Sequence, residues 1–364
     1  MRIAVLGVGL IGGSIGLAAR RRLGAEVAGY DPDHAILERA LEREALDERA
    51  GSVAEAVAGA DVVFCAAPVG ALPAIIREAL GASSGDAVVT DVGSTKRGLV
   101  DALADDAAGE RFIGGHPLAG AETAGVEGAR ADLFEGARWY LTPAEGSSGV
   151  HYDRLQRAIA DLGARPQAID AATHDRLMAT VSHLPHVLAN VLASQAAAAS
   201  ADETERMPEV GRSFRDSTRV AGANPGIWAD IFATNSDADA AEIDAVVERL
   251  REAADLLRAG DSEALAAWHH GARDDRRALL EGEAAGGPLQ ELRVVVDNRP
   301  GTVAEIALAL GEAGVNIEDM ALDPAADMET GAVTLWIAGE EAAARAAETM
   351  RRLGHSAAAV PSGE

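Results

Sequence analysis

Short, continuous apolar runs alternate with amphipathic stretches from residue 2 to about residue 142. The runs are RIAVLG, EVAGYD, DVVFCAAP, AVVTDVG, RFIGGHP and RWYLTP. Runs of this kind, rich in β-branched residues and separated by helical spacing, indicate strands buried on both faces of a parallel sheet and joined by helices. We therefore expect residues 1–150 to form an α/β domain, which ends at the linker AEGSSG.

Helical spacing of apolar residues dominates the middle of the chain, residues 151–284. Apolar residues recur three or four positions apart in HDRLMATVSHLPHVLANVLASQAAAA and in DADAAEIDAVVERLREAADLLRAG. The strand signal nearly vanishes here, apart from ARPQAI. We expect an all-helical domain whose apolar surface exceeds what one copy can cover, which predicts a homodimer.

A linker rich in Gly and Ala, GEAAGGP at 282–288, precedes the last part of the chain. Strand and helix patterns then follow as ELRVVVDNRPG, TVAEIALALGEAG, VNIEDMALD, GAVTLWIAG, EEAAARAAETMRRLG and SAAAV. The order β-α-β-β-α-β is that of a small ferredoxin-like domain. We expect this domain over residues 289–364.

The composition changes this picture mainly through its charge. The formal net charge of −26 argues against a nucleic acid or an anionic membrane as partner, because the summed field repels phosphates and acidic headgroups. Of the 32 basic residues only Lys96 is a lysine, which by itself indicates a coding bias rather than chemistry. A small anionic substrate would need local cations to overcome the field.

Cysteine usage and apolar segments predict a cytoplasmic protein. The single cysteine, Cys65, cannot form an internal disulfide, which fits a reducing compartment. No apolar segment reaches the roughly 20 residues needed to span a bilayer. The N-terminal apolar run leads straight into a loop motif instead of a small-residue cleavage site, so we expect no signal peptide.

The glycine motif GVGLIG, residues 7–12, follows the first expected strand and opens a helix. In that context Gly7 permits a tight turn, Gly9 lets the backbone approach a pyrophosphate, and Gly12 lets the helix pack closely on the strand. Asp31 ends the second strand 19 residues after Gly12, where a carboxylate binds ribose hydroxyls and repels a 2′-phosphate. The expected cofactor is therefore NAD. Its expected ligands are Gly7, Gly9, Leu10, Ile11, Gly12, Asp31 and Pro68.

Arg20, Arg21 and Arg22 offer an alternative, because arginines near a dinucleotide site can bind the 2′-phosphate of NADP. We expect them instead to solvate the end of the helix.

The loops APVG, DVGSTK and GGHPLAGAE should meet at the carboxyl edge of the sheet, where α/β proteins bind ligands. His116 is the histidine in these loops, and imidazole suits removal of a proton from a hydroxyl whose carbon loses hydride. Ser94, near the start of a helix, either caps that helix or hydrogen-bonds the reacting hydroxyl. Both are candidate catalytic residues.

Four motifs in order, DVGSTK with GGHPLAGAE, THDRLMATVSHLPH, SFRDSTRVA and NPGIW, resemble the prephenate dehydrogenase family of tyrosine biosynthesis. The resemblance runs from residue 1 to about residue 280. The segment DNRPGTVAEIALALGEAGVNIEDM resembles an ACT domain, the amino-acid-sensing module that some members carry.

The resemblance implies a reaction and roles for particular residues. Hydride leaves C4 of prephenate for NAD⁺, a base takes the C4 hydroxyl proton, and CO₂ departs to give 4-hydroxyphenylpyruvate. His116 would hydrogen-bond the hydroxyl and Ser94 would assist it, while Arg219 would bind a substrate carboxylate. Further expected substrate-site residues are His186, His183, Asp216, Arg215, Glu122 and Trp228.

Several of these residues have alternative interpretations. His183 is expected to be a satisfied core histidine, and Asp216 to pair with Arg219 or with His186. Arg215 is expected to reach across a dimer interface, and Glu122 to gate the site. A metal held by the H-x-x-H pair with His174 is disfavoured, because no carboxylate lies at a convincing spacing.

The substrate and the reaction class also have alternatives. Arg212 and Ser213 stand where a glycine-rich lead-in to the arginine motif is expected, which leaves L-arogenate as a second substrate beside prephenate. A different NAD-linked hydroxy-acid dehydrogenase would use Lys96 as its acid or base. A catalytically inactive NAD-binding regulator would bind the cofactor without turnover.

For the C-terminal module, the resemblance implies an effector site at the Pro-Gly turn and the loop after the helix. Asp297, Gly301 and Asn316 are the candidate ligands, and tyrosine is the expected effector. The alternative is a module that serves only dimerisation.

Overall fold

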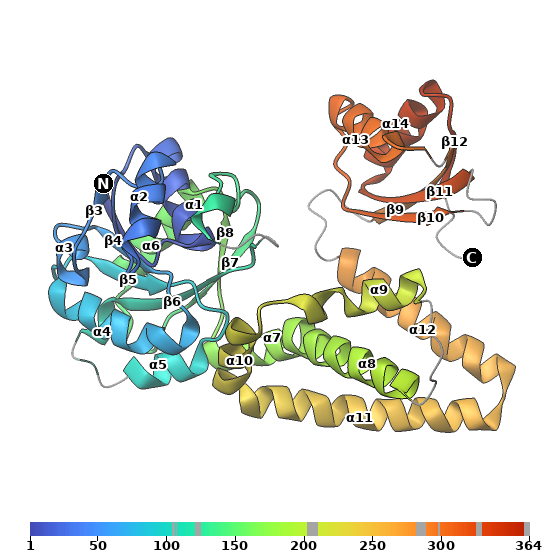
Figure 1. Ribbon diagram of the computed structural model, residues 1–364, viewed down its shortest axis with the longest axis horizontal. Coiled ribbons are helices and arrows are strands. Elements are labelled where there is room, and N and C mark those ends of the chain that lie inside the picture. The colour runs from blue at the N-terminus through green and yellow to red at the C-terminus, as the bar shows by residue number, and fades with distance from the viewer. Residues whose placement is uncertain are drawn as a thin grey trace. The chain divides into compact units, whose positions relative to one another are not determined.

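All six apolar runs form strands of one sheet (Figure 1). They are β1 (Arg2–Leu6), β2 (Glu26–Tyr30), β4 (Val62–Cys65), β5 (Val88–Asp91), β6 (Phe112–Pro117) and β7 (Arg138–Thr142). With β3 (Glu48–Arg49) and β8 (Arg165–Ala168) the order is β3-β2-β1-β4-β5-β6-β7-β8. The strand order reverses between β1 and β4, which is where doubly wound sheets leave a crevice for a ligand.

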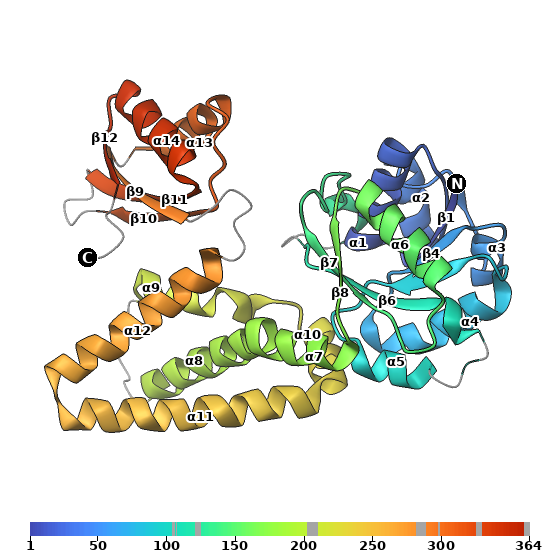
Figure 2. The same cartoon turned by 180° about the vertical axis from the view of Figure 1, so that it is seen from behind.

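Helices cover both faces of this sheet (Figure 2). One face carries α1 (Leu10–Ala18), which continues as the π-helical turn η1 (Ala19–Leu23), with α2 (His34–Glu42) and α6 (Gly149–Asp161). The other face carries α3 (Val53–Val57), α4 (Leu72–Ala82) and α5 (Arg97–Leu103). Short 3-10 turns are η2 (Val69–Ala71), η3 (Gly109–Arg111) and η4 (Val126–Gly128).

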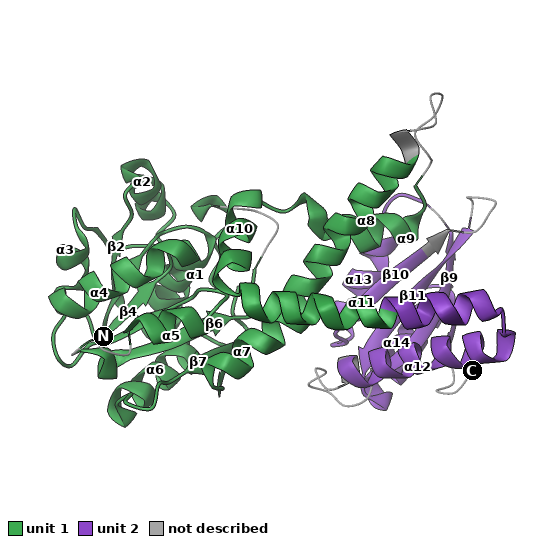
Figure 3. Cartoon of the chain, turned by 90° about the horizontal axis from the view of Figure 1, so that it is seen from below, with its two compact units in different colours: residues 1–249 green, residues 250–364 purple. Residues whose placement is uncertain are grey.

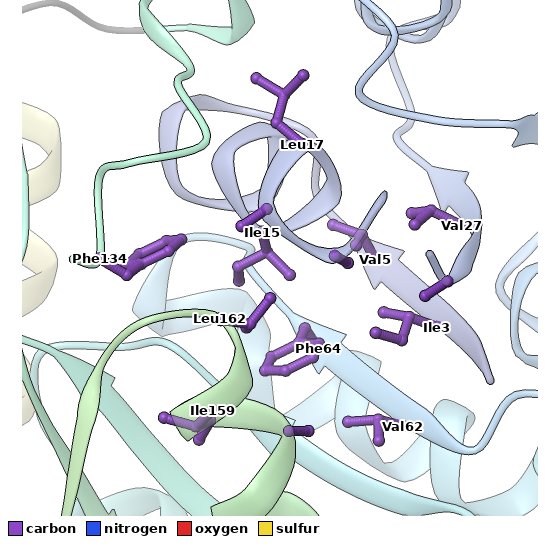
Figure 4. Close-up of a cluster of buried hydrophobic side chains, with 14 of the residues drawn as sticks. Ile3, Val5, Ile15, Leu17, Val27, Val62, Phe64, Phe134, Ile159 and Leu162 are labelled. Carbon is purple, nitrogen blue, oxygen red and sulfur yellow. The ribbon is translucent and has the colours of Figure 1, made fainter. Parts of the chain in front are cut away.

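Strand β1 shows how the sequence pattern builds both layers. Because successive side chains of a strand point to opposite faces, Ile3 and Val5 join the cluster under α1, while Ala4 and Leu6 join the cluster on the other face. Figure 4 shows Ile3 and Val5 with Ile15 of α1. A continuous apolar run is therefore what a strand between two helical layers requires.

Two strands, β7 and β8, run opposite to the other six, which differs from the expectation of an all-parallel sheet. β1 to β6 pair in parallel, but β7 is antiparallel to β6. A parallel return needs a helical crossover. In the part of the β6–β7 connection that the structure describes, 118–120 and 125–137, the helical segment is only the three-residue turn η4.

The first layered domain also extends beyond residue 150. The segment ARPQAI supplies β8, which pairs with β7 and ends at Ala168, and α6 packs on this part of the sheet. β8 is an edge strand, parallel to β7, and its residues are largely exposed, so it needs no apolar run and its sequence signal is weak.

The structure is a computed structural model. It describes residues 1–103, 106, 108–120, 125–201, 210–281, 289–297, 299–324 and 330–359. The chain divides into two compact units, residues 1–249 and residues 250–364 (Figure 3).

Beyond β8 the first unit is helical, as the spacing predicts. A long helix comprises α7 (Ala171–Met178), the π-helical turn η5 (Ala179–His183) and α8 (Leu184–Ala201). It is followed by α9 (Arg212–Thr218), the 3-10 turn η6 (Arg219–Gly222), α10 (Pro225–Thr234) and α11 (Ser236–Ala259). α7 packs against α5 and β7, and α10 packs against η2, so the helices close over the carboxyl edge of the sheet. Among the described residues, no helix combines the length and apolarity needed to cross a bilayer.

The second unit holds the end of α11 from residue 250, α12 (Ser262–Glu281) and a separate four-stranded antiparallel sheet. The elements in chain order are β9 (Leu289–Asp297), α13 (Thr302–Glu312), β10 (Asp319–Pro324), β11 (Thr330–Ala338), α14 (Glu340–Arg352) and β12 (Ser356–Ala359). The strand order is β10-β11-β9-β12. Buried residues of β9 and β11 pack against α13 and α14 in a core of their own.

Candidate functional site

The three glycines of GVGLIG have different steric surroundings, as their expected roles require. Gly7 has a φ of +96°, a conformation that favours glycine. A Cβ on Gly12 would lie 2.0 Å from the carbonyl oxygen of Gly7, so only glycine lets α1 start this close to the turn. A Cβ on Gly9 would meet nothing within 4 Å. The loop therefore has open space where a pyrophosphate would approach.

Asp31 is fixed beside this glycine loop. Its carboxylate accepts hydrogen bonds from the backbone N–H of Val8 at 2.9 Å and of Asp33 at 3.0 Å. The segment after β4 that contains Pro68 also borders the loop, because a Cβ on Gly7 would lie 2.6 Å from the oxygen of Ala66. Leu10 and Ile11 form the first turn of α1, whose N–H groups suit an anion. The described residues thus fit the dinucleotide that the motif predicts.

The arginines Arg20, Arg21 and Arg22 belong to the far end of the same helix, in η1. Arg20 pairs with Asp47 at 3.0 Å, and Arg22 pairs with Glu135. They lie at the opposite end of α1 from the glycine loop, so they do not form a 2′-phosphate site at Asp31.

A cavity of about 270 Å³ lies where the helical part meets the carboxyl edge of the sheet. It joins the loop after β5, the end of β6, the π-helical turn η5 and α10. Its lining residues are Ser94, His116, Pro117, Leu118, Ala119, Met178, Val181, Ser182, His183, Trp228 and Ile231. Four residues predicted from the sequence, Ser94, His116, His183 and Trp228, thus share one cavity.

His116 is held by a chain of hydrogen bonds behind the cavity. Its Nδ1 lies 2.9 Å from Nε2 of the buried His174, and Nδ1 of His174 lies 2.7 Å from the carboxylate of Asp175. A carboxylate only accepts, so His174 donates from Nδ1 and accepts at Nε2. His116 therefore carries its own proton on Nδ1, and its Nε2 is left as an acceptor.

The surroundings of His116 also keep its ring neutral. Burial lowers the pKa of His116 well below its ordinary value, and the neighbouring His174, Lys96 and His183 lower it further by disfavouring a positive charge on its ring. A neutral imidazole with a free Nε2 lone pair can accept a hydroxyl proton.

Hydrogen bonds fix the loop that carries Ser94 to α7 and to α10. The backbone N–H groups of Lys96 and Arg97, at the start of α5, donate to the two carboxylate oxygens of Asp175 at 2.8 Å each. The hydroxyl of Thr95 contacts that of Thr234 in α10 at 2.9 Å. Asp175 thus supplies the acceptor that a cap of α5 would provide, which leaves the Ser94 hydroxyl for the cavity.

Lys96, the lone lysine, is fully buried and donates a hydrogen bond to Asp91. The same carboxylate accepts the N–H of Gly93 at 2.7 Å and the N–H of Gly115 at 3.0 Å. Burial lowers the pKa of Lys96, while Asp91 opposes that shift. The Lys96 side chain does not line the cavity, so its place is to hold together the loops of Ser94 and His116.

His183 belongs to a second buried histidine and aspartate pair. Its Nδ1 lies 2.8 Å from the carboxylate of Asp239, which also accepts a bond from Asn235 at 3.1 Å. Asn235 donates as well to the backbone oxygen of Asp175 at 3.0 Å, so the two pairs are linked. His183 is satisfied as a core histidine and also lines the cavity.

The π-helical turn η5 ends at His183 and precedes Pro185. Proline has no N–H to donate to the preceding turn, so the hydrogen-bond ladder must rearrange there. The inserted turn lies next to the cavity, where such turns often occur in functional helices.

His186 is buried and stacks on Trp228, with ring centroids 3.5 Å apart and an interplanar angle of 22°. Burial, and then His183, lower the pKa of His186. His186 thus forms the wall behind Trp228 and is not among the residues that line the cavity.

The remaining predicted residues lie elsewhere. Arg215, Asp216 and Arg219 are exposed on α9 and η6 and are not among the cavity-lining residues. Asp216 pairs with Arg212 one helical turn away, at 3.4 Å, a partner that we had not expected. Glu122 lies outside the described residues, and Asp297, Gly301 and Asn316 belong to the second unit.

Sequence reasoning missed Asp175, Asn235 and Asp239, and it considered His174 only as a metal ligand. In the described residues, no group of three or more His, Cys, Asp or Glu side chains is arranged to hold a metal ion. A usable signal exists, because His174, Met178 and Ser182 recur every four residues and so share one face of the expected helix, with Asp175 beside them.

Two family models match this chain, one within the first unit and one that continues past residue 249. The family model described as the prephenate dehydrogenase nucleotide-binding domain matches residues 15–167, and the one described as the prephenate dehydrogenase dimerization domain matches residues 170–270. Their junction falls after β8, in agreement with the extent of the sheet.

Individual relatives agree with this match. The prephenate dehydrogenase of Bacillus subtilis (strain 168) is 32% identical over 330 residues, which cover 87% of each chain. A crystal structure of prephenate dehydrogenase from Aquifex aeolicus, in complex with hydroxyphenyl propionate and NAD⁺, has a TM-score of 0.72 and 30% identity. It covers 77% of this chain and 98% of that one. Synechocystis arogenate dehydrogenase has a TM-score of 0.65 and 27% identity, covering 76% and 99% of the respective chains. This chain belongs to the prephenate dehydrogenase family.

Proposed function

We propose that this chain catalyses the NAD-dependent oxidative decarboxylation of prephenate to 4-hydroxyphenylpyruvate in tyrosine biosynthesis. The observation that carries the proposal is that His116, whose Nδ1 is engaged by His174, lines a cavity at the carboxyl edge of β5 and β6. That edge also carries the glycine loop after β1. The Aquifex aeolicus relative, solved with NAD⁺ and a hydroxyphenyl acid, supports the pairing of cofactor and substrate class.

The protein has to orient prephenate against the cofactor and to polarise the C4 hydroxyl. NAD⁺, when bound, supplies the acceptor for the hydride that leaves C4. His116 accepts the C4 hydroxyl proton at Nε2, and the Ser94 hydroxyl hydrogen-bonds the same oxygen. Met178, Trp228 and Ile231 form apolar walls against which the substrate ring can lie. The loss of CO₂ and the formation of the aromatic ring then make the step effectively irreversible.

Recognition of the dianionic substrate needs a cation, because the chain carries a net charge of −26. We assign this role to Arg219, whose guanidinium suits bidentate capture of a carboxylate. Arg219 begins η6, which packs against α8, the continuation of the helix that carries His183. Arg215, Asp216 and His186 would order this side of the site, and Glu122 would gate it.

Prephenate is the proposed substrate in preference to L-arogenate, which differs in bearing an amino group in place of the side-chain keto group. Relatives named for each substrate match this chain. Purified protein supplied with NAD⁺ and either compound, followed by NADH absorbance, decides between them. Turnover with neither compound would refute the proposed function.

Residues 289–364 are proposed to form an ACT domain with a ferredoxin-like fold that senses tyrosine. Its element order, β-α-β-β-α-β, supports this. Gly301, with a φ of +94°, is the N-cap that precedes α13, and the backbone oxygen of Asp297 accepts a hydrogen bond from the Thr302 hydroxyl at 3.0 Å. Asn316 lies in the loop after the same helix and donates to Glu318 at 2.8 Å. Tyrosine should inhibit the full chain, and Asn316→Ala should weaken that inhibition; an enzyme indifferent to tyrosine would refute the sensor.

We also propose that the protein is a homodimer in the cytoplasm. The match of residues 170–270 to a domain described as a dimerization domain supports a homodimer. The buried, unpaired Cys65 and the soluble nucleotide cofactor fit the cytoplasm. Sedimentation at micromolar protein concentration would test the dimer.

A further inference from the structure

Asp175 contacts both candidate catalytic segments from a buried position. The residue is 2% exposed. One carboxylate oxygen accepts from Nδ1 of His174 at 2.7 Å and from the backbone of Lys96 at 2.8 Å, and the other accepts from the backbone of Arg97 at 2.8 Å. One carboxylate therefore touches the histidine behind His116 and the loop that carries Ser94.

The direction of the hydrogen bonds along this chain is set at Asp175. Because the carboxylate is an acceptor, Nδ1 of His174 must donate to it, and Nε2 of His174 must then accept from Nδ1 of His116. The proton of a neutral His116 is thereby held on the side away from the cavity. The opposite tautomer would present an N–H to the reacting hydroxyl, and the ring could not accept its proton.

Among the residues that the structure describes, the carboxylate in contact with the two rings is that of Asp175. His116 is faced by His174, by Lys96 with its partner Asp91, and by His183 with its partner Asp239. Tyr140 packs edge-on against His174 at 5.6 Å between ring centroids. Asp175 is the acidic group that contacts His174, so it is placed to stabilise an imidazolium formed on His116.

We propose that Asp175, acting through His174, is a positioning residue that sets the tautomer of His116 and holds the Ser94 loop against it. The proposal rests on the proposed function for its kinetic consequences, but the tautomer itself is a property of the resting enzyme. In the reaction the hydroxyl O–H bond breaks and an N–H bond forms at Nε2 of His116. The charge that this creates is shared along His174 towards Asp175.

The tautomer is measured directly by nitrogen-15 NMR of protein labelled in its histidines, at about pH 8, where neutral imidazole predominates. The His116 signals are assigned by their loss in His116→Asn. We expect the proton on Nδ1 in the wild type. His174→Gln should keep it there, because the amide oxygen can accept from Nδ1, whereas His174→Leu should release it to Nε2.

Steady-state kinetics are measured on the same variants and, in addition, on Asp175→Asn. Asp175→Asn and His174→Leu should lower kcat by about 10²–10⁴-fold, the usual contribution of general acid–base catalysis, with KM for prephenate changed by less than about threefold. His174→Gln should retain more activity than His174→Leu. Asp170→Asn is the matched control, since Asp170 is an exposed cap of the same helix that bonds the N–H of Thr173 and should leave kcat unchanged.

The possible results distinguish the positioning role of Asp175 from the proposed function. A wild-type His116 that carries its proton on Nε2 would overturn the positioning role, whether or not the enzyme turns over prephenate. Normal kcat in Asp175→Asn and His174→Leu would overturn it as well. A wild type that shows the Nδ1 proton but does not oxidise prephenate would contradict the proposed function alone. If Asp175→Asn does not fold, the wild-type tautomer and the two His174 variants decide.

Discussion

Lys96 and Asp91 form an ion pair from which solvent is excluded, since neither side chain has any exposed surface. Asp91 also accepts hydrogen bonds from the backbone N–H groups of Gly93 and Gly115. The pair therefore connects the loop after β5 with strand β6. The one lysine among 31 arginines is thus placed where its slender ammonium group fits.

Replacing Lys96 should destabilise the fold. Lys96→Met leaves the Asp91 carboxylate buried without its cation, which costs about 3–5 kcal/mol. The free energy of unfolding, measured with denaturant, checks this. Arg97→Met is the matched control, because the Arg97 and Asp101 pair is exposed and 3.8 Å apart, and such pairs contribute about 0–1 kcal/mol. Equal effects of the two substitutions would contradict a structural role for Lys96.

Two glycines of the dinucleotide loop should respond differently to alanine. Gly12→Ala places a Cβ 2.0 Å from the Gly7 oxygen and should lower stability by about 1–3 kcal/mol, as overpacking does. Gly9→Ala meets no protein atom within 4 Å, so its melting temperature should stay that of the wild type. Its affinity for NAD⁺ should fall by about tenfold or more, equivalent to about 1.4 kcal/mol. Unchanged NAD⁺ affinity in Gly9→Ala would place the cofactor elsewhere.

The pH dependence of kcat/KM should reflect the lowered pKa of His116. The base works only when neutral, so activity is lost as the pH falls through its pKa. Because burial, His174, Lys96 and His183 lower that pKa, the acid limb should lie below the ordinary histidine value of about 6.5. Stopped-flow or steady-state rates in buffers of constant ionic strength test this. An acid limb at or above the ordinary value would contradict the environment described for His116.

Substitutions at His116 and Arg219 should separate chemistry from binding. His116→Asn should lower kcat by about 10²–10⁴-fold with little change in KM. Arg219→Ala should raise KM by about 10- to 100-fold, since a hydrogen bond to a charged group contributes about 1.5–3 kcal/mol. Arg258→Ala, at an exposed arginine paired with Asp255, serves as the control. The reverse pattern would mean that the two roles are exchanged.

The sequence predicted those features that depend on neighbours along the chain. The apolar strands of the first sheet follow from apolar runs, and the steric demands at Gly7 and Gly12 follow from a local motif. The shared cavity of Ser94 and His116 follows from the rule that parallel strands end at one edge. The antiparallel direction of β7 depends on what connects it to β6, and an apolar run does not record direction.

The site features that were not predicted depend on contacts between residues far apart in the sequence. Asp175 bonds Lys96 across 79 positions, and His183 bonds Asp239 across 56. A carboxylate on an amphipathic helix is indistinguishable in sequence from a solvated one until its partner is known. Resemblance named Arg219 and His186, but only the structure shows that His186 stacks behind Trp228 rather than lining the cavity.

The most direct test of the central claim is turnover of prephenate by the purified chain in the presence of NAD⁺, followed by NADH absorbance and by release of CO₂. We expect the wild type to form NADH and 4-hydroxyphenylpyruvate in equal amounts. In His116→Asn the rate should be at least about 100-fold lower. Protein that binds NAD⁺ but produces no NADH from prephenate or from arogenate would contradict the central claim.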